Sequence, residues 1–185
     1  MQRRAEQVDE TRQRIIDATV GLHGTIGPAA TTIAGIAEAA GVTRLTVYRH
    51  FPDDTTLFEA CSADWLAQQR RPDPSAWADI PDPEQRLRAG LTDVYRFYRA
   101  GAGMLFRIHR DIDTIPESRR EYLRDTDRQL TALLAAPITG PAGQRRRRRA
   151  VIAHAVSFWT WWSLCHEQGL TDREAIDVLV NAALG

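Results

Sequence analysis

The side chains best suited to bind another molecule lie between Thr43 and His50. The guanidinium of Arg44 can donate two parallel hydrogen bonds to guanine. The hydroxyl and methyl groups of Thr43 and Thr46 can contact base edges or the methyl group of thymine. Tyr48 and His50 have polar tips that suit phosphate oxygens, and such contacts set the register on DNA without reading its sequence. The spacing predicts base readout at the start of one helix and phosphate anchoring further along it.

Such chemistry requires a helix whose first turn is exposed, and the flanking residues predict one. Thr32 is expected to cap a short helix that ends at Ala40, Gly41 to form a left-handed turn, and Thr43 to cap a second helix that runs to about Phe51. Two short helices joined in this way form a helix-turn-helix, whose second helix lies in the major groove. The predicted DNA contacts are Thr32, Thr43, Arg44, Thr46, Tyr48 and His50.

A longer pattern surrounds these residues and covers about 50 positions. It comprises Thr11, Ile15, Ala18, Leu22, Gly27, Thr32, Ile36-Ala37, Ala40-Gly41-Val42-Thr43, Val47-Tyr48-Arg49-His50-Phe51 and Leu57. A G-V-T-x-x-x-V-Y-x-H-F string preceded by T-I-x-x-I-A is specific, and the pattern resembles the TetR family of transcriptional regulators. The resemblance implies an α-helical homodimer with an N-terminal three-helix DNA-binding domain and a C-terminal domain that binds a small molecule and releases DNA.

Two residues depart from the family pattern. His23 stands where the first helix usually has an aromatic core residue, and Asp54 stands where a Lys usually lies close to the DNA backbone. Asp53 is the predicted N-cap of the helix that follows Pro52, with Asp54 in its first turn. The 24 basic residues are all Arg and are balanced by 24 acids, so binding to a polyanion would depend on local placement.

The apolar periodicity is helical almost throughout and predicts an all-α fold of about nine helices. Breaks at Gly and Pro separate short helical segments near the N-terminus from longer ones that follow. The stretch from Arg71 to Pro83 indicates a boundary after the N-terminal module. We expect a helix-turn-helix DNA-binding domain in residues 1–58 and a ligand-binding and dimerisation domain in residues 59–185.

An aromatic-rich, Met-containing set of residues in the second part is the predicted lining of a ligand cavity, by resemblance to the family. The residues are Tyr95, Tyr98, Met104, Phe106, His109, Tyr122, Phe158 and Trp162. Such a lining favours a small apolar or aromatic effector fixed by a few polar tips, such as the Tyr hydroxyls and His109. The alternative is that these are ordinary core side chains.

The segment Ala150 to Cys165 is apolar around its whole circumference, so as a helix it needs neighbours on all sides. The helix Thr171 to Leu184 carries a second, small-residue face besides its core face. Together they predict a four-helix homodimer interface, the arrangement that the family uses. The preceding run Arg145 to Arg149 is interpreted as the solvated start of a long helix, with a membrane-surface helix and a second nucleic-acid contact as alternatives.

The sequence has no phosphate loop, no metal-ligand spacing and no nucleophile elbow, so we expect neither an enzyme nor a cofactor or metal. Cys61 and Cys165 show no paired spacing, and no secretory signal is visible, which predicts a cytoplasmic protein with reduced thiols and no membrane partner. The leading hypothesis is a ligand-responsive homodimeric repressor of palindromic operator DNA. The alternative is a helical small-molecule-binding or interaction dimer with a weakened DNA-binding module.

Overall fold

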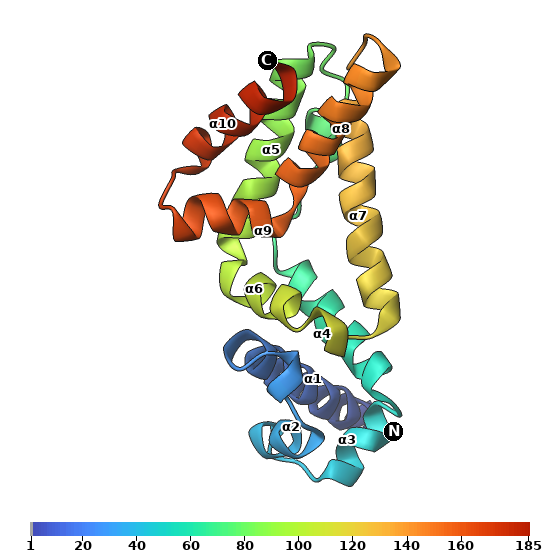
Figure 1. The fold of residues 1–185 in the computed structure, drawn as a ribbon. Helices are drawn as coiled ribbons and strands as arrows, with labels where there is room; N and C mark the ends of the chain where they lie inside the picture. The colour runs from blue at the N-terminus through green and yellow to red at the C-terminus, as the bar shows by residue number, and fades with distance from the viewer. Residues whose placement is uncertain (1) are drawn as a thin grey trace. The chain divides into compact units, whose positions relative to one another are not determined.

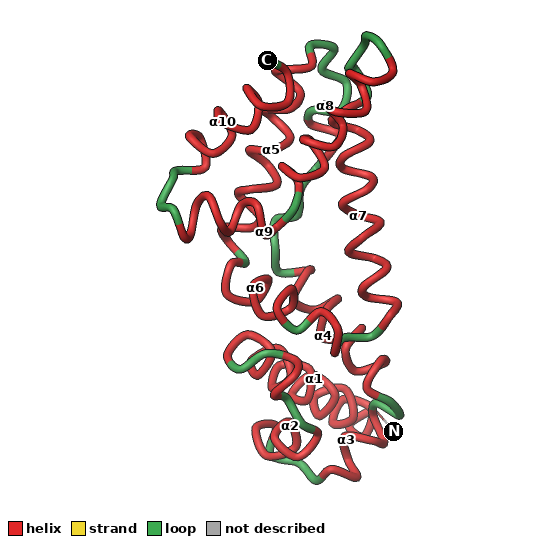
Figure 2. Tube along the Cα trace, viewed as in Figure 1, coloured by secondary structure: helices red, strands yellow, loops and turns green. Residues whose placement is uncertain are grey.

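The computed structural model describes the backbone of residues 2–185 and the side chains of residues 7–185. Within that range every regular element is helical, which confirms the all-α prediction (Figure 2). The α-helices are α1 Gln2–Thr25, α2 Ile33–Ala40, α3 Arg44–His50, α4 Asp54–Ala67, α5 Pro83–Ala100, α6 Ala102–Arg110, α7 Glu117–Ala135, α8 Ala142–Val156, α9 Phe158–Trp161 and α10 Asp172–Leu184. Short helical turns are η1 Pro28–Ala30, η2 Pro74–Ala76, η3 Ile112–Thr114 and the π-helical η4 Trp162–Glu167.

The chain divides into two compact units. The N-terminal unit runs to Gln69 and also takes in Ala102–Arg120, and the second unit consists of Arg70–Gly101 and Glu121–Gly185. Helix α6 therefore packs with the first unit although α5 precedes it in the sequence. The functional boundary expected between residues 58 and 59 stays a prediction, because a packing unit need not coincide with a functional domain.

In the N-terminal unit, α1 packs against α2, α4 and α6, and α2 packs against α3 (Figure 1). The core is a cluster of buried side chains: Ile15, Ile16, Ile36, Ala37, Ala40, Val47, Phe51, Leu57 and Cys61. Their spacing of three and four residues along each helix explains why short helices that are marginal alone form here, since burial of one face stabilises them.

In the second unit, α5, α8 and α10 contact one another (Figure 1). Helix α5 buries Leu87, Leu91, Val94 and Tyr95. At Gly90, an added Cβ would lie 2.3 Å from a methyl carbon of Leu134 and 3.4 Å from the Trp77 ring. Glycine at this position therefore lets α7 and the segment before α5 approach the α5 backbone closely.

The apolar segment from Ala150 to Cys165 is not one helix, contrary to the sequence prediction. Helix α8 ends at Val156, Ser157 has extended backbone (ψ 134°), and α9 and η4 follow. The break leaves carbonyls without helical partners, and two hydroxyls replace those partners. Tyr95 donates to Ala155 O at 2.9 Å, and Tyr98 donates to Val156 O at 2.7 Å.

Candidate nucleic-acid interface

Side-chain caps define both helices of the helix-turn-helix. Thr32 Oγ1 accepts a hydrogen bond from Gly35 N at 3.1 Å, and Thr43 Oγ1 accepts one from Thr46 N at 3.2 Å. Gly41 has φ 65°, a left-handed conformation that Gly adopts without steric cost. The predicted caps and turn are thus confirmed, and the start of α3 is set by neighbouring residues rather than by distant contacts.

Helix α3 separates a core face from an exposed face. Val47 is fully buried in the domain core, while Arg44 is exposed and Tyr48 is 49% exposed. Residues 44 and 48 are four apart and so share one side of the helix. The structure therefore places a guanidinium and a phenol side by side on the surface that a helix-turn-helix presents to DNA.

Leu45 and Arg49 belong to the same exposed face but were not among the predicted contacts. Leu45 is 70% exposed, the most exposed large apolar side chain among the described residues, and Arg49 is also exposed. An apolar side chain at this place suits a thymine methyl group, and a second guanidinium suits phosphate. The spacing of these two residues from buried Val47 could have revealed them, because positions 45 and 49 fall opposite the core.

Thr43 and Thr46 differ from the other predicted contacts because their hydroxyls bond to each other at 2.9 Å. Thr43 also caps α3, so it has a structural task whether or not DNA is present. The Thr32 hydroxyl oxygen likewise caps its own helix, α2, and the side chain is exposed. His50 is half-buried at the end of α3. Their roles as DNA contacts stay predictions.

The start of α4 confirms the predicted placement of two acids. Asp53 is the N-cap and accepts a hydrogen bond from Thr56 N at 2.7 Å, which together with the Thr56 hydroxyl lowers the pKa of its carboxyl group. Asp54 is the first helical residue and is exposed. Both carboxylates interact favourably with the positive end of the α4 dipole.

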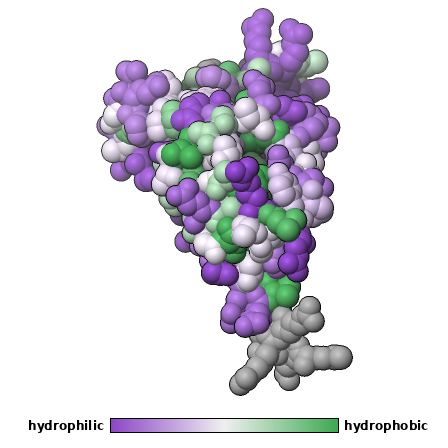
Figure 3. Space-filling model, turned by 90° about the horizontal axis from the view of Figure 1, so that it is seen from below, coloured by the Kyte–Doolittle hydropathy of each residue, from purple (hydrophilic) through white to green (hydrophobic). Residues whose placement is uncertain are grey.

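The face of the protein drawn in Figure 3 is a mixture of hydrophilic and hydrophobic residues. The hydrophobic residues form separate patches between hydrophilic ones. Residues 1–71 contain 8 Arg and 9 Asp or Glu, so this region carries no net positive charge. Attraction to phosphate must therefore come from individual side chains such as Arg44 and Arg49.

His23 takes an aromatic position in the core of this unit. It is 8% exposed, and its ring centroid lies 5.2 Å from that of Phe58. Burial lowers the pKa of His23 from 6.5 to about 4, although the Asp111 carboxylate acts in the opposite direction. The imidazole is therefore neutral at neutral pH and packs as an aromatic ring.

A comparison with protein families matches residues 15–61 to the model described as "Bacterial regulatory proteins, tetR family". These residues include α2, α3 and the start of α4, the elements whose caps and exposed face are described above. The N-terminal region belongs to the TetR family.

Curated TetR-type relatives match over the same region. The chain is 44% identical over 53 residues to the HTH-type transcriptional regulator AcrR of Shigella flexneri, and 43% identical over 60 residues to the HTH-type transcriptional regulator TtgR of Pseudomonas putida. These matches cover 29% and 32% of this chain but only 25% and 29% of the two relatives. Both relatives are named as regulators, not as enzymes.

Solved structures resemble the fold of this chain over almost its whole length. A TetR transcriptional regulator from Rhodococcus sp. RHA1 has a TM-score of 0.52 at 18% identity and covers 96% of this chain and 95% of its own. A putative fatty acid metabolism regulator from Clostridium perfringens has a TM-score of 0.56 at 16% identity and covers 92% and 96%. At this identity the likeness establishes the fold alone.

The predicted effector residues fall in both units of the chain. Tyr95, Tyr98 and Phe158 are buried in the second unit, where the rings of Tyr98 and Phe158 meet edge to face at 5.4 Å. Trp162 is half-buried and stacks on His166 at 3.8 Å, and Tyr122 is exposed and accepts a hydrogen bond from Arg71.

Met104, Phe106 and His109 lie on α6 of the N-terminal unit and are half-buried. Burial lowers the pKa of His109 to about 4, so this side chain would offer a neutral imidazole to a ligand. The role of all eight residues in effector binding stays a prediction.

Two kinds of feature are absent from the part of the chain that the structure describes. No group of three or more His, Cys, Asp or Glu side chains in that part of the chain could hold a metal ion. None of its helices combines the length and apolar character that crossing a membrane requires.

Proposed function

We propose that this chain is a ligand-responsive transcriptional regulator that binds palindromic operator DNA as a homodimer and acts as a repressor. The observation that carries the proposal is the exposed face of α3, where Arg44, Leu45 and Tyr48 project from a helix capped by Thr43. The TetR match over residues 15–61 supports the same conclusion, since that segment contains this helix. Selection of bound sequences from a random DNA pool tests it, and enrichment of a palindrome is the expected result.

Arg44→Ala should weaken binding to the selected operator by about 1 to 3 kcal/mol and relax the base preference at one position per half-site. The reason is that a guanidinium at the start of α3 can pair with guanine, whereas Ala cannot. Binding to the operator and to random DNA is measured by titration at fixed salt, with Arg173→Ala on α10 as an exposed control. Equal losses on both DNAs would instead assign Arg44 to the backbone.

The homodimer is proposed from apolar surface on two helices. Val178 on α10 is 52% exposed, and Trp159 on α9 is 43% exposed, while Ala153 and Ala182 are exposed as well. On α10, residues 178 and 182 share one side, opposite buried Leu179 and Val180. A second copy of the same surface would cover these side chains in an isologous interface.

Ala182→Arg should convert the dimer to monomers, because two long charged side chains would then meet near the symmetry axis without partners. Sedimentation at matched protein concentrations measures the change, with Gln168→Arg outside this face as the control. A fully dimeric Ala182→Arg variant would place the interface elsewhere.

The effector proposed for this regulator is a small apolar or aromatic molecule that contacts the predicted lining residues. The hydroxyls of Tyr95 and Tyr98 already bond to backbone carbonyls, so these residues would offer ring surface rather than polar contacts. The proposed coupling is that effector binding changes the spacing of the two recognition helices in the dimer.

A dimer with a weakened DNA-binding module is the second candidate, favoured by the acidic start of α4. Asp54 is exposed beside the capped helix-turn-helix, where a family-like docking would bring its carboxylate near a phosphate. Under this candidate the protein binds a small molecule or a partner and has little affinity for any DNA, so the selection would enrich no sequence.

Asp54→Lys should tighten binding to every DNA alike and steepen the dependence of log K on log salt by about 0.9 per new phosphate contact. The preferred operator should not change, because a phosphate contact carries no sequence information. Asp54→Asn is the matched control, since it removes the repulsion without adding a contact and should leave the slope unchanged. An Asp54→Lys variant with the parent's affinity and slope would show that residue 54 points away from DNA.

A further inference from the structure

The segment between α4 and α5 is fixed to α5 by one carboxylate and one guanidinium. Asp93 accepts hydrogen bonds from Asp73 N at 2.6 Å, from Trp77 Nε1 at 3.4 Å and from Arg96 Nη2 at 2.5 Å. Arg96 in turn donates to the Arg70 carbonyl at 2.8 Å. The pKa of Asp93 is lowered despite its burial, because Arg96 and the two N–H donors stabilise the charged form.

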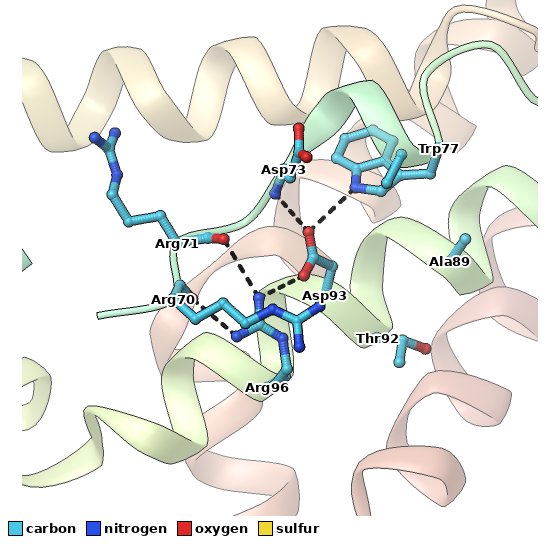
Figure 4. Close-up of a pocket in the computed structure, with 9 residues that line it drawn as sticks. Arg70, Arg71, Asp73, Trp77, Ala89, Thr92, Asp93 and Arg96 are labelled. Carbon is cyan, nitrogen blue, oxygen red and sulfur yellow. Dashed lines mark hydrogen bonds and ion pairs between the residues drawn. The ribbon is translucent and has the colours of Figure 1, made fainter. Parts of the chain in front are cut away.

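An open groove of about 560 Å³ lies beside this anchor, within the second unit (Figure 4). Its volume falls in the range of small-molecule sites. Ala76, Ala89 and the nearly buried Trp77 give it an apolar part, and Thr92 adds one hydroxyl. None of the predicted effector residues lines it, so it is a different site from the one proposed above.

The carboxylates that line this groove have hydrogen-bond partners, whereas one of its guanidinium groups has none in the described part of the chain. Both carboxylates are already engaged, since Asp73 accepts from the Ser75 amide and hydroxyl groups and Asp93 from the three donors named above. Arg70 has no hydrogen-bond or ion-pair partner for its guanidinium among the described residues. Its side chain extends toward Asp93 and Arg96, whereas that of Arg71 points away and donates to Tyr122 (Figure 4).

Arg70 and Arg96 therefore both lie beside Asp93, and because Arg96 already pairs with that carboxylate, the guanidinium of Arg70 is left without a partner among residues 7–185. Guanidinium pairs strongly with carboxylate because its parallel N–H groups can make two hydrogen bonds at once. We propose that this groove binds a small organic acid, whose carboxylate pairs with Arg70 next to Arg96 and whose apolar body lies against Ala76 and Ala89.

The groove is a second ligand site, and its occupation does not require DNA binding. Calorimetric titration of the full chain with 2-naphthoate, octanoate and benzoate tests it, with 2-naphthamide as a neutral analogue of the first. At least one acid should bind saturably at one molecule per chain. Naphthamide should bind at least tenfold more weakly than naphthoate, and an increase in sodium chloride from 50 to 300 mM should weaken the acids alone.

Arg70→Gln should lower the affinity for the acid about tenfold or more, whereas Arg71→Gln should change it less than twofold because that side chain points away from the groove. Phe158→Ala should leave this Arg70-dependent binding intact, which separates it from binding among the predicted effector residues. Three results would overturn the proposal: equal affinity for naphthamide and naphthoate, equal losses in the two Arg variants, or no acid binding that Arg70→Gln removes.

Discussion

Replacing Tyr95 and Tyr98 together by Phe should lower the free energy of unfolding by about 2 to 5 kcal/mol. Each hydroxyl is the hydrogen-bond donor to a carbonyl at the end of α8, and both Tyr side chains are almost fully buried. Phe keeps the ring but leaves the carbonyls of Ala155 and Val156 without a donor in a place that water does not reach. A buried carbonyl without a donor costs about 1 to 3 kcal/mol.

Chemical denaturation at one protein concentration measures this loss, because the stability of a dimer depends on concentration. Tyr122→Phe is the matched control, since that hydroxyl is exposed, accepts a hydrogen bond from Arg71, and its loss should cost less than about 0.5 kcal/mol. The two single variants should each show part of the loss. A double variant as stable as the parent would mean that the break at Ser157 does not depend on the two hydroxyls.

Acidification should destabilise the protein through His23, by up to about 3 kcal/mol between pH 7 and pH 4. The folded state holds the pKa of His23 at about 4, below the ordinary 6.5 of an unfolded chain. The unfolded state therefore binds the proton first, and stability that is fully present above pH 6.5 is lost as the pH falls toward 4. His109, whose pKa burial also lowers to about 4, contributes in the same direction.

His23→Phe separates the two contributions, because Phe fills the position beside Phe58 and carries no titratable group. The variant should lose about half of the parent's pH dependence in this window while keeping the His109 share. His154→Gln, an exposed substitution on α8, is the control and should follow the parent. A His23→Phe variant with the parent's full pH dependence would show that His23 is not buried as a neutral ring.

The local signals in the sequence predicted the helix-turn-helix well, because its helix ends are set by neighbouring residues. Thr32, Gly41, Thr43 and Asp53 each act within three or four positions of their own place in the chain. A cap of this kind needs only a side-chain oxygen and a nearby N–H, so the residue type and the position suffice to predict it. A local cap of the same kind begins α10, where Thr171 forms a capping box with Glu174.

Features that depend on distant residues were not predictable in this way. The break at Ser157 is stabilised by hydroxyls about 60 residues away, while the segment itself is uniformly apolar. The groove beside Asp93 likewise depends on Asp73, Trp77 and Arg96 from two separate segments. Leu45 is a different case, because its spacing from Val47 was enough to predict that it lies opposite the core.

Because its 24 basic residues are all Arg, we expect this protein to keep its ion pairs at high pH. The ion pairs Arg88–Asp177, Arg96–Asp93 and Arg99–Asp172 keep their charges well above pH 10, where lysine ammonium groups would lose theirs. Burial raises the pKa of the Cys61 thiol to about 12 and that of Cys165 to about 11, so the unfolded chain releases these protons first. At high pH the stability of the fold is therefore limited by ionisation of the thiols and the buried Tyr hydroxyls, while the Arg–Asp ion pairs persist.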